Sequence, residues 1–338
     1  MRTLFIGGTK RGYLTVKSLV ESGAEIAGIL SLKQDEHERE RYELPMRALA
    51  TMNGIPFRET KWIKRDEIAE WIQQEVRPDL GIVVGCRVLL PKEIYEMPPR
   101  GTVAVHDSLL PANRGFAPLN WSIINGQDHT GVTLFYLNES VDAGDVLGQT
   151  RVAIGRCDTA PAVYDRVCQA TVDLVLETYP RLANNTAIAM PQDASKATFL
   201  CSRTPLDGLI DWASDTAEIH NQVRGLTYPY PGAFTFYGGK KLIVWRAQPI
   251  ESSPVYVGRI PGRVVEVNKQ EGSIDVLTRD GVLRIFEVDY DGRGMSTSAQ
   301  VITSVRATLG MRPADLLARI EALETQLAAL EGADSVAS

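Results

Sequence analysis

The residues best suited to chemistry lie in the stretch 105–121, which reads VHDSLLPANRGFAPLNW. An apolar, β-branched run precedes His106 and predicts a strand that ends at this histidine. Pro111 turns the chain after the strand, and Arg114 and Gly115 then place a cation beside a flexible backbone position. Because an imidazole exchanges a proton near neutral pH, this pattern predicts an acid–base centre at the carboxyl end of a strand.

Strands and helices alternate in the sequence that leads up to this stretch. Apolar runs, several of them bounded by glycine, predict strands at residues 3–8, 25–30, 79–85 and 101–110, and the patterns between them predict helices at 13–22, 42–53 and 65–75. Such an alternation is typical of an α/β fold with a parallel-rich sheet and helices on both faces. Ligands bind beyond the carboxyl ends of the strands in these sheets, where His106 is expected.

The second half of the chain has a different pattern. Strands are predicted at 131–137 and 145–154, a helix at 159–182, and a polar, proline-containing linker at 183–197. Short β-rich runs with glycine and asparagine turns then indicate a small barrel or sandwich; they lie at 242–245, 262–268, 273–277 and 282–288. We therefore expect a catalytic domain at 1–190 and a smaller β-rich domain at 200–310.

A final helix is predicted at 312–332. Its apolar residues are spaced by four, three, four and three positions, as in the seam of a coiled coil; they are Leu316, Ile320, Leu323, Leu327 and Leu330. The seam is only about two heptads long, which is marginal for an isolated helix. Two arrangements are left open: the helix docks onto the body of the protein, or it forms a homodimer.

Composition limits the class of protein. The 338 residues are 44% hydrophobic and 23% charged, and no apolar run reaches the roughly 18 residues of a membrane span. The amino terminus lacks a signal-peptide pattern. Four scattered cysteines form no close pair, so we expect no zinc or other metal site, no disulfide and a cytoplasmic location. The net charge of −6 argues weakly against a polyanionic substrate such as tRNA.

Two motifs follow one another in the first half of the chain. The motif H-x-S-L-L-P-x-x-R-G begins at His106 and continues into A-P-L-N-W, and VDAGD follows at 141–145. Together they resemble the signature of the 10-formyltetrahydrofolate-dependent formyltransferases. Similar segments at 203–212, 220–225 and 229–234 extend the resemblance over most of residues 1–250. It implies a Rossmann-like catalytic domain, a C-terminal OB-type domain, and a formyltransferase activity with 10-formyltetrahydrofolate as co-substrate.

This resemblance assigns roles to the active-site residues. His106 is expected to take a proton from the attacking amine, and Asp142 to orient His106 and favour its charged form. The family normally has an asparagine two positions before the histidine, whose amide binds the developing oxyanion. Here that position is Ala104. Loss of one such donor typically lowers the rate by about 10²–10³.

Ala104 leaves three explanations open. A neighbouring group could supply the donor, and Asn120 and His129 are candidates by residue type alone. The protein could instead carry out altered one-carbon chemistry, or bind folate without catalysis. The alanine could also be an engineered change.

The resemblance implies two further groups of residues. Cofactor-binding residues are expected at a strand end and at a later loop; they are Arg87, Val88, Leu89, Leu90, Asn138 and Asp142. Substrate-binding residues are expected in the turn after His106; they are Ser108, Leu109, Pro111, Arg114 and Gly115. The alternative for Leu89 and Leu90 is that they begin the packing of the next helix, and for Arg87 that it caps the turn.

The wording of these segments is closest to the domain that formylates UDP-4-amino-4-deoxy-arabinose. We therefore predict transfer of the formyl group to the primary amine of a nucleotide-linked amino sugar. Formylation of methionyl-tRNA is the first alternative, and only this alternative makes a nucleic acid the partner. Cationic and acidic residues are mixed over residues 259–287 and give no clear basic stripe that would favour it.

Overall fold

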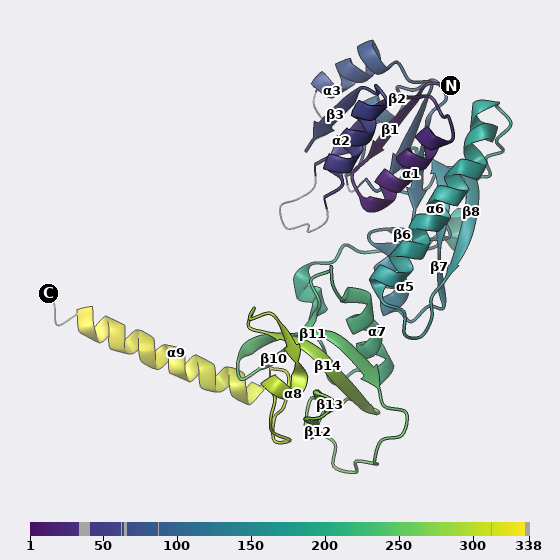
Figure 1. Ribbon diagram of the computed structural model, residues 1–338. Helices are drawn as coiled ribbons and strands as arrows, with labels where there is room; N and C mark the ends of the chain where they lie inside the picture. Colours follow the sequence, from purple (N-terminus) through teal and green to yellow (C-terminus); the bar gives the residue numbers. More distant parts are fainter. Residues whose placement is uncertain (34–40, 62, 64–65, 87, 312, 335–338) are drawn as a thin grey trace. The chain divides into compact units, whose positions relative to one another are not determined.

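The computed structural model describes residues 1–33, 41–61, 63, 66–86, 88–311 and 313–334. These residues form two compact units (Figure 1). Unit 1 contains Met1–Ile123 and Gln127–Ser202, and unit 2 contains Ile124–Gly126 and Arg203–Ser338. The chain thus contributes a three-residue segment to unit 2 before it returns to complete unit 1.

A seven-stranded sheet forms the centre of unit 1, in the order β3-β2-β1-β4-β5-β7-β8. The parallel strands are β1 (Thr3–Gly7), β2 (Ile26–Leu32), β3 (Phe57–Thr60), β4 (Leu80–Val84) and β5 (Thr102–His106). The antiparallel strands are β7 (His129–Tyr136) and β8 (Val146–Ala153). The strand order reverses between β1 and β4, which is where such sheets bind ligands. The predicted α/β class with a parallel-rich sheet is confirmed.

Helices cover both faces of this sheet. On one face α1 (Lys10–Glu21) packs against α6 (Ala160–Ala183) and also contacts α2 (Glu43–Met52). On the other face, residues of α3 (Asp66–Trp71), its π-helical continuation η1 (Ile72–Val76) and α4 (Lys92–Tyr95) form a hydrophobic cluster with the sheet. Strands β1, β2 and β4 are buried along their whole length, which explains their continuous apolar runs.

Several short elements of unit 1 were not apparent from the sequence pattern. They are β3, α4, α5 (Pro118–Ile124), and the parallel pair β6 (Arg114–Gly115) and β9 (Phe199–Leu200). The prediction of a linker at 183–197 is also wrong in part. Met190 forms an antiparallel bridge with Val146, and η2 (Ala194–Lys196) follows it. One- and two-residue pairings of this kind have no periodicity, so a sequence pattern cannot reveal them.

Unit 2 is built on a six-stranded antiparallel sheet in the order β10-β11-β14-β13-β12, with β15 paired to β14. The strands are β10 (Ala233–Tyr237), β11 (Lys240–Pro249), β12 (Val264–Asn268), β13 (Ser273–Leu277), β14 (Val282–Tyr290) and β15 (Met295–Thr297). Helix α7 (Thr216–Leu226) packs against β11. The predicted smaller β-rich C-terminal domain is confirmed.

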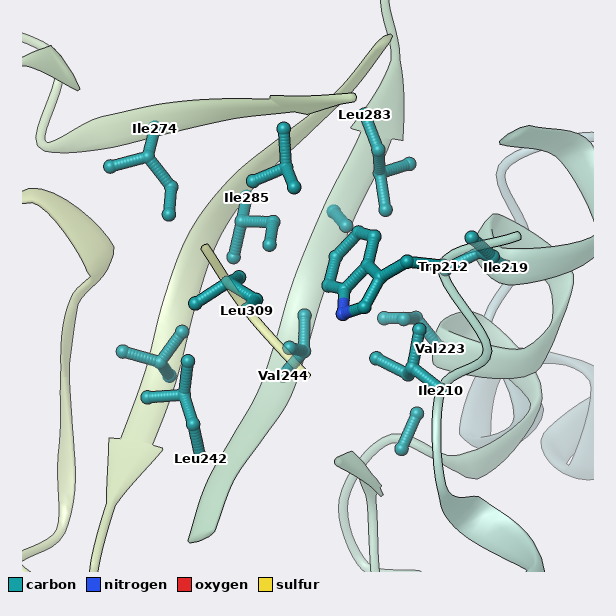
Figure 2. Close-up of a cluster of buried hydrophobic side chains, with 14 of the residues drawn as sticks. Ile210, Trp212, Ile219, Val223, Leu242, Val244, Ile274, Leu283, Ile285 and Leu309 are labelled. Atoms are coloured by element: carbon teal, nitrogen blue, oxygen red, sulfur yellow. The ribbon is translucent and has the colours of Figure 1, made fainter. Parts of the chain in front are cut away.

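Trp212 lies in the core of unit 2 (Figure 2). Its ring is enclosed by Ile219 of α7 and by Val244 and Leu283 of the sheet. The indole N–H donates a hydrogen bond of 3.0 Å to the hydroxyl of Thr235. The large ring therefore fills the core without leaving its one polar atom unsatisfied.

Short 3₁₀ and α-helical segments complete unit 2; they are η3 (Pro205–Gly208) and α8 (Ser298–Val301). The chain then forms α9 (Pro313–Asp334), which confirms the predicted C-terminal helix. None of the helices in the described part of the chain has both the length and the apolar content that a membrane span requires.

Candidate active site

His106 is the last residue of β5, and its side chain is buried. Its Nε2 lies 2.8 Å from the carbonyl oxygen of Asn113, and its Nδ1 lies 3.5 Å from Oδ2 of Asp142. A carbonyl only accepts hydrogen bonds, so Nε2 carries the proton in this contact. In the neutral ring, Nδ1 therefore presents its lone pair on the side of Asp142. The structure brings together the histidine and the aspartate that the two motifs supplied.

Burial lowers the pKa of His106 below its ordinary value, because the charged ring would lose its hydration. The Asp142 carboxylate and the Asn113 carbonyl act in the opposite direction, whereas the Arg11 guanidinium adds to the lowering. Arg11 is buried at the start of α1 and forms an ion pair with Asp107. The net direction differs from the expectation that Asp142 would make the charged ring the favoured form. Burial thus favours the neutral form of the His106 ring.

Asp142 adopts a left-handed backbone conformation, with φ of +52°. This is uncommon for a residue with a side chain and marks a locally constrained position. Its Oδ2 accepts a 2.9 Å hydrogen bond from the backbone N–H of Gly115. Gly115 itself has φ of +102°, and a Cβ there would lie 2.7 Å from the carbonyl oxygen of Leu200. Only glycine fits at this position, so the Arg-Gly pair of the motif serves to hold the aspartate.

Gln192 connects the segment of Arg114 to the loop of Asp142. Its Oε1 accepts from Nε and Nη2 of Arg114, at 3.2 and 2.7 Å. Its Nε2 donates to the carbonyl oxygens of Asp142 and Gly144, at 2.9 and 2.7 Å. Arg114 is buried and directed at Gln192 and the Phe199 ring, which indicates a structural role rather than contact with substrate. Sequence reasoning missed Gln192, because an isolated glutamine in a polar stretch carries no pattern.

The turn after His106 is braced by hydrogen bonds within the protein. Ser108 is buried, and its hydroxyl donates to the carbonyl oxygen of Ala112 at 2.6 Å. The hydroxyl of Thr133 donates to the carbonyl oxygen of Ser108 at 2.6 Å and accepts from the N–H of Leu110 at 3.1 Å. These contacts give Ser108 a part in shaping the turn rather than in binding substrate.

Leu109 and Pro111 occupy the same turn and are half-buried. Leu109 lies close against Gly131, where a Cβ would come within 2.3 Å of the leucine side chain. Their partial exposure is compatible with the predicted contact with substrate.

Ala104 is buried in β5, opposite Val83 of β4 and Phe135 of β7. It belongs to an apolar cluster that also contains Leu110. The position that carries an amide in the family pattern is therefore surrounded here by hydrophobic side chains.

The two candidate donors lie in different places. His129 begins the eight-residue strand β7, whereas Phe135, the partner of Ala104, is next to its last residue. The two ends are about 20 Å apart along the strand, so His129 cannot replace the missing amide. His129 instead contacts Asp128 and Arg151. Asn120 is buried in α5.

Exposed apolar side chains follow strand β4. Parallel pairing of β4 with β5 brings the residues after β4 to the same end of the sheet as His106. Val88 and Leu89 are 39% and 78% exposed there, whereas Leu90 packs against the cluster that contains Ala104. For Leu90 the structure thus favours the alternative, in which this side chain packs in the hydrophobic core and does not bind the cofactor. Arg87 lies outside the described residues.

The loop at 138–142 leads to Asp142 and contains the other residues predicted to bind the cofactor. The carboxamide oxygen of Asn138 accepts from the N–H of Ser140 at 3.0 Å, so this side chain shapes the loop. Val141 is 48% exposed, and an ion pair between Glu139 and Lys92 links the loop to α4. Exposed apolar side chains beside the backbone of a loop fit the flat, polar-edged ring system of a folate.

The described residues contain no group of three or more His, Cys, Asp or Glu side chains arranged to hold a metal ion. Cys86 lies near the site, but burial raises the pKa of its thiol to about 11. The thiol donates to the carbonyl oxygen of Val88 at 3.1 Å. A protonated, partly buried thiol is a poor nucleophile, and Cys86 packs against the hydrophobic cluster of the sheet.

Comparison with known protein families decides the class. The model described as formyl transferase matches residues 1–178, and the model of the formyl transferase C-terminal domain matches residues 203–306. The chain belongs to the formyl transferase family. It is a formyltransferase enzyme, and its co-substrate is 10-formyltetrahydrofolate, as the motifs predicted.

Two methionyl-tRNA formyltransferases are similar to this formyltransferase over most of its length. The methionyl-tRNA formyltransferase of Alkaliphilus oremlandii is 33% identical over 295 residues, which are 87% of this chain and 93% of the relative. That of Citrifermentans bemidjiense is 32% identical over 324 residues, 95% of this chain and 98% of the relative. A solved N-formyltransferase from Helicobacter canadensis, in complex with folinic acid and dTDP-3-aminofucose, superimposes with a TM-score of 0.62. It is 16% identical, over 84% of this chain and 98% of its own, and shows the fold alone.

These relatives overturn the prediction of an amino-sugar substrate. Five relatives that are 30–33% identical to this chain over 86–95% of its length are methionyl-tRNA formyltransferases. The motif wording that suggested a sugar lies in short segments that the family shares across substrates. The methionyl-tRNA alternative is the better supported reading.

Proposed function

We propose that this formyltransferase transfers the formyl group of 10-formyltetrahydrofolate to the amine of methionyl-tRNA. The observation that carries the proposal is the extent of the relatives. They match at 32–33% identity across the catalytic unit and the C-terminal β unit together. The acceptor in this proposal is a primary amine that must lose a proton as it attacks, which is the chemistry a buried neutral histidine performs.

His106 acts as the general base. Its Nε2–H is committed to the Asn113 carbonyl oxygen, so Nδ1 is the nitrogen that accepts the proton of the amine. The amine would attack the formyl carbon of the bound folate, the bond from that carbon to the folate nitrogen would break, and the proton held by His106 would pass to the leaving nitrogen of tetrahydrofolate. Because the pKa of His106 is lowered, the ring is in the neutral form that accepts a proton at neutral pH.

Asp142 stabilises His106 after the proton arrives. Its Oδ2 lies 3.5 Å from Nδ1, so the carboxylate attracts an N–H⁺ at that position and repels the lone pair of the neutral ring. The Gly115 N–H and the Gln192 carboxamide fix the carboxylate before the reaction begins. Interactions that strengthen only as charge develops lower the barrier rather than the energy of the bound substrate.

Ala104 leaves the developing oxyanion without the amide that the family pattern supplies. His129 is too distant to replace it, and Ala104 itself lies among apolar side chains. We infer that catalysis here rests on the base and on positioning, with a rate below that of a family member with asparagine by up to about 10²–10³.

The folate would contact the residues that follow β4 and the loop at 138–142. Val88, Leu89 and Val141 would flank its flat ring, since their side chains are exposed. The backbone around Asn138–Asp142 would meet its polar edge. Leu109 and Pro111 would lie on the side of the amine. A cytoplasmic location remains a prediction.

The RNA would be bound with few phosphate contacts. Four cations among the described residues of unit 2 already form ion pairs: Arg279 with Asp215, Arg284 with Asp275, Lys240 with Asp291 and Arg246 with Glu287. Each phosphate contact contributes about 0.7–0.9 to the slope of log K against log salt. A shallow slope is therefore expected for this protein.

The acceptor is identified by direct competition. Labelled 10-formyltetrahydrofolate is supplied with the full chain and either methionyl-tRNA or a panel of nucleotide-linked amino sugars, and kcat/KM is measured for each. The proposal expects the label on methionyl-tRNA, with a kcat/KM at least about 10²-fold above any sugar. A preference for any sugar would refute it, whereas unacylated tRNA serves as the control that must stay unlabelled.

A further inference from the structure

Helix α9 carries a regular row of exposed apolar side chains. Leu316, Ile320, Leu323 and Leu327 are spaced by four, three and four positions, and each is between 45% and 57% exposed. Single exposed leucines are ordinary on protein surfaces, but a row along one face of a helix is not. Figure 1 shows α9 as one continuous helix, which presents these residues along a single face. These side chains therefore form an exposed apolar face on α9.

The residue types on this face specify the kind of partner. In heptad notation, Leu316 and Leu323 occupy d, and Ile320 and Leu327 occupy a. A β-branched residue at a with leucine at d favours a two-stranded coiled coil. A second copy of this chain supplies the same face with the same spacing.

The charged residues beside the row indicate whether two such helices pair in parallel or antiparallel orientation. Arg319 occupies position g, and Glu324 occupies the following position e. In a parallel pair, g of one helix faces the next e of its partner, so two Arg319–Glu324 contacts form. In an antiparallel pair g faces g and e faces e. The side chains described at these positions, Arg319 and Gln326 at g and Leu317 and Glu324 at e, then give no pair of opposite charges.

We propose that α9 pairs with α9 of a second copy in a parallel, in-register coiled coil, so that the formyltransferase is a dimer. From Leu316 to Leu327 the row is only about 18 Å long at 1.5 Å per residue. Its buried area falls at or below the lower end of stable interfaces, about 1,200 Å². The dimer therefore dissociates on dilution.

Analytical ultracentrifugation of the full chain over a concentration series tests pairing. We expect the mass to rise from 37.2 kDa toward twice that value as the concentration increases. Leu323→Asp should abolish the rise, because it places a carboxylate in the seam. Thr325→Asp, two residues away on the outer face, is the matched control and should still dimerise. A monomer at every concentration, or a dimer that survives Leu323→Asp, would overturn the proposal.

Charge reversal tests the parallel orientation of the two helices and leaves the apolar seam unchanged. Arg319→Glu alone sets two carboxylates against each other across the seam, and Glu324→Arg alone sets two guanidinium groups together, so each should weaken self-association at least tenfold. An equimolar mixture of the two variants has complementary charges on both sides and should associate as tightly as the wild type. If the mixture stays monomeric while the wild type dimerises, the parallel arrangement is wrong.

Discussion

A buried imidazole with one nitrogen committed to a backbone carbonyl has a single nitrogen left for proton transfer. In this site that nitrogen is Nδ1 of His106, which faces Asp142 at 3.5 Å. Burial keeps the ring neutral, and the carboxylate stabilises it once it is charged. Burial lowers the pKa of His106 and the carboxylate raises it, so the pH dependence of the rate should depend on both.

The pH dependence of kcat/KM tests this balance. A base must be deprotonated, so the rate is full above its pKa and falls as the pH drops through it. Since the pKa of His106 is lowered, the fall should lie below its ordinary value of about 6.5. Asp142→Asn removes an interaction that raises this pKa, so the fall should move to still lower pH while kcat decreases about 10²-fold. A shift to higher pH would contradict the assigned roles.

Gln192 is a positioning residue, because it acts on Asp142 through the backbone. Gln192→Leu removes its hydrogen bonds to Arg114 and to the loop. We expect kcat to fall about 10–100-fold with little change in KM for the folate, and the pH profile to shift in the direction of Asp142→Asn. Gln169→Leu, at an exposed position of α6, is the control and should change neither. Loss of stability without a change of pH profile would mean that Gln192 is only structural.

Ala104→Asn tests the missing oxyanion donor. The new amide should raise kcat about 10–100-fold, since one donor contributes up to about 3–4 kcal/mol. It should also lower the free energy of unfolding by about 1–3 kcal/mol, because the surroundings are apolar. Ala104→Leu matches the added size without a donor and should only destabilise. A decrease of kcat in a folded Ala104→Asn protein would indicate that another group already binds the oxyanion.

At the scale of elements, the site depends on the short pair β6–β9. The pair aligns Gly115 with Leu200 and so directs the Gly115 N–H at Asp142. Gly115→Ala should lower the free energy of unfolding by about 2–4 kcal/mol and kcat by at least tenfold, through strain and the contact at 2.7 Å. Gly23→Ala also has a positive φ, but its Cβ would meet open space. It should cost about 1 kcal/mol and leave kcat unchanged, and equal effects of the two would refute the role of β6.

The elements that sequence could predict are those with enough residues to show a period. Strands β1, β2 and β4 appeared as apolar runs because both their faces are buried. By contrast, β6, β9 and the bridge at Met190 each consist of one or two residues. They form only when distant segments meet, so Gln192 and its hydrogen bonds could not be predicted. His106 was found because it ends a strand, whereas its contact with Asp142 came from the resemblance.

At the scale of the whole molecule, fold and substrate are separate questions. The Helicobacter canadensis sugar enzyme shares the fold at 16% identity, so the fold does not select the acceptor. The motifs near His106 identify the chemistry, and the relatives that match both units support the proposed acceptor. The amino-sugar prediction was wrong because it rested on short motif segments that the family shares across substrates, whereas the relatives match over 86–95% of the chain.

Single-turnover transfer of labelled formyl to methionyl-tRNA is the most direct test of this account. The full wild-type chain is compared with His106→Ala and with His129→Ala, and folate binding is measured for each. We expect the wild type and His129→Ala to label the amine at the same rate, and His106→Ala to be slower by at least about 10² with folate still bound. Full activity of His106→Ala, or no labelling of methionyl-tRNA by the wild type, would contradict the account.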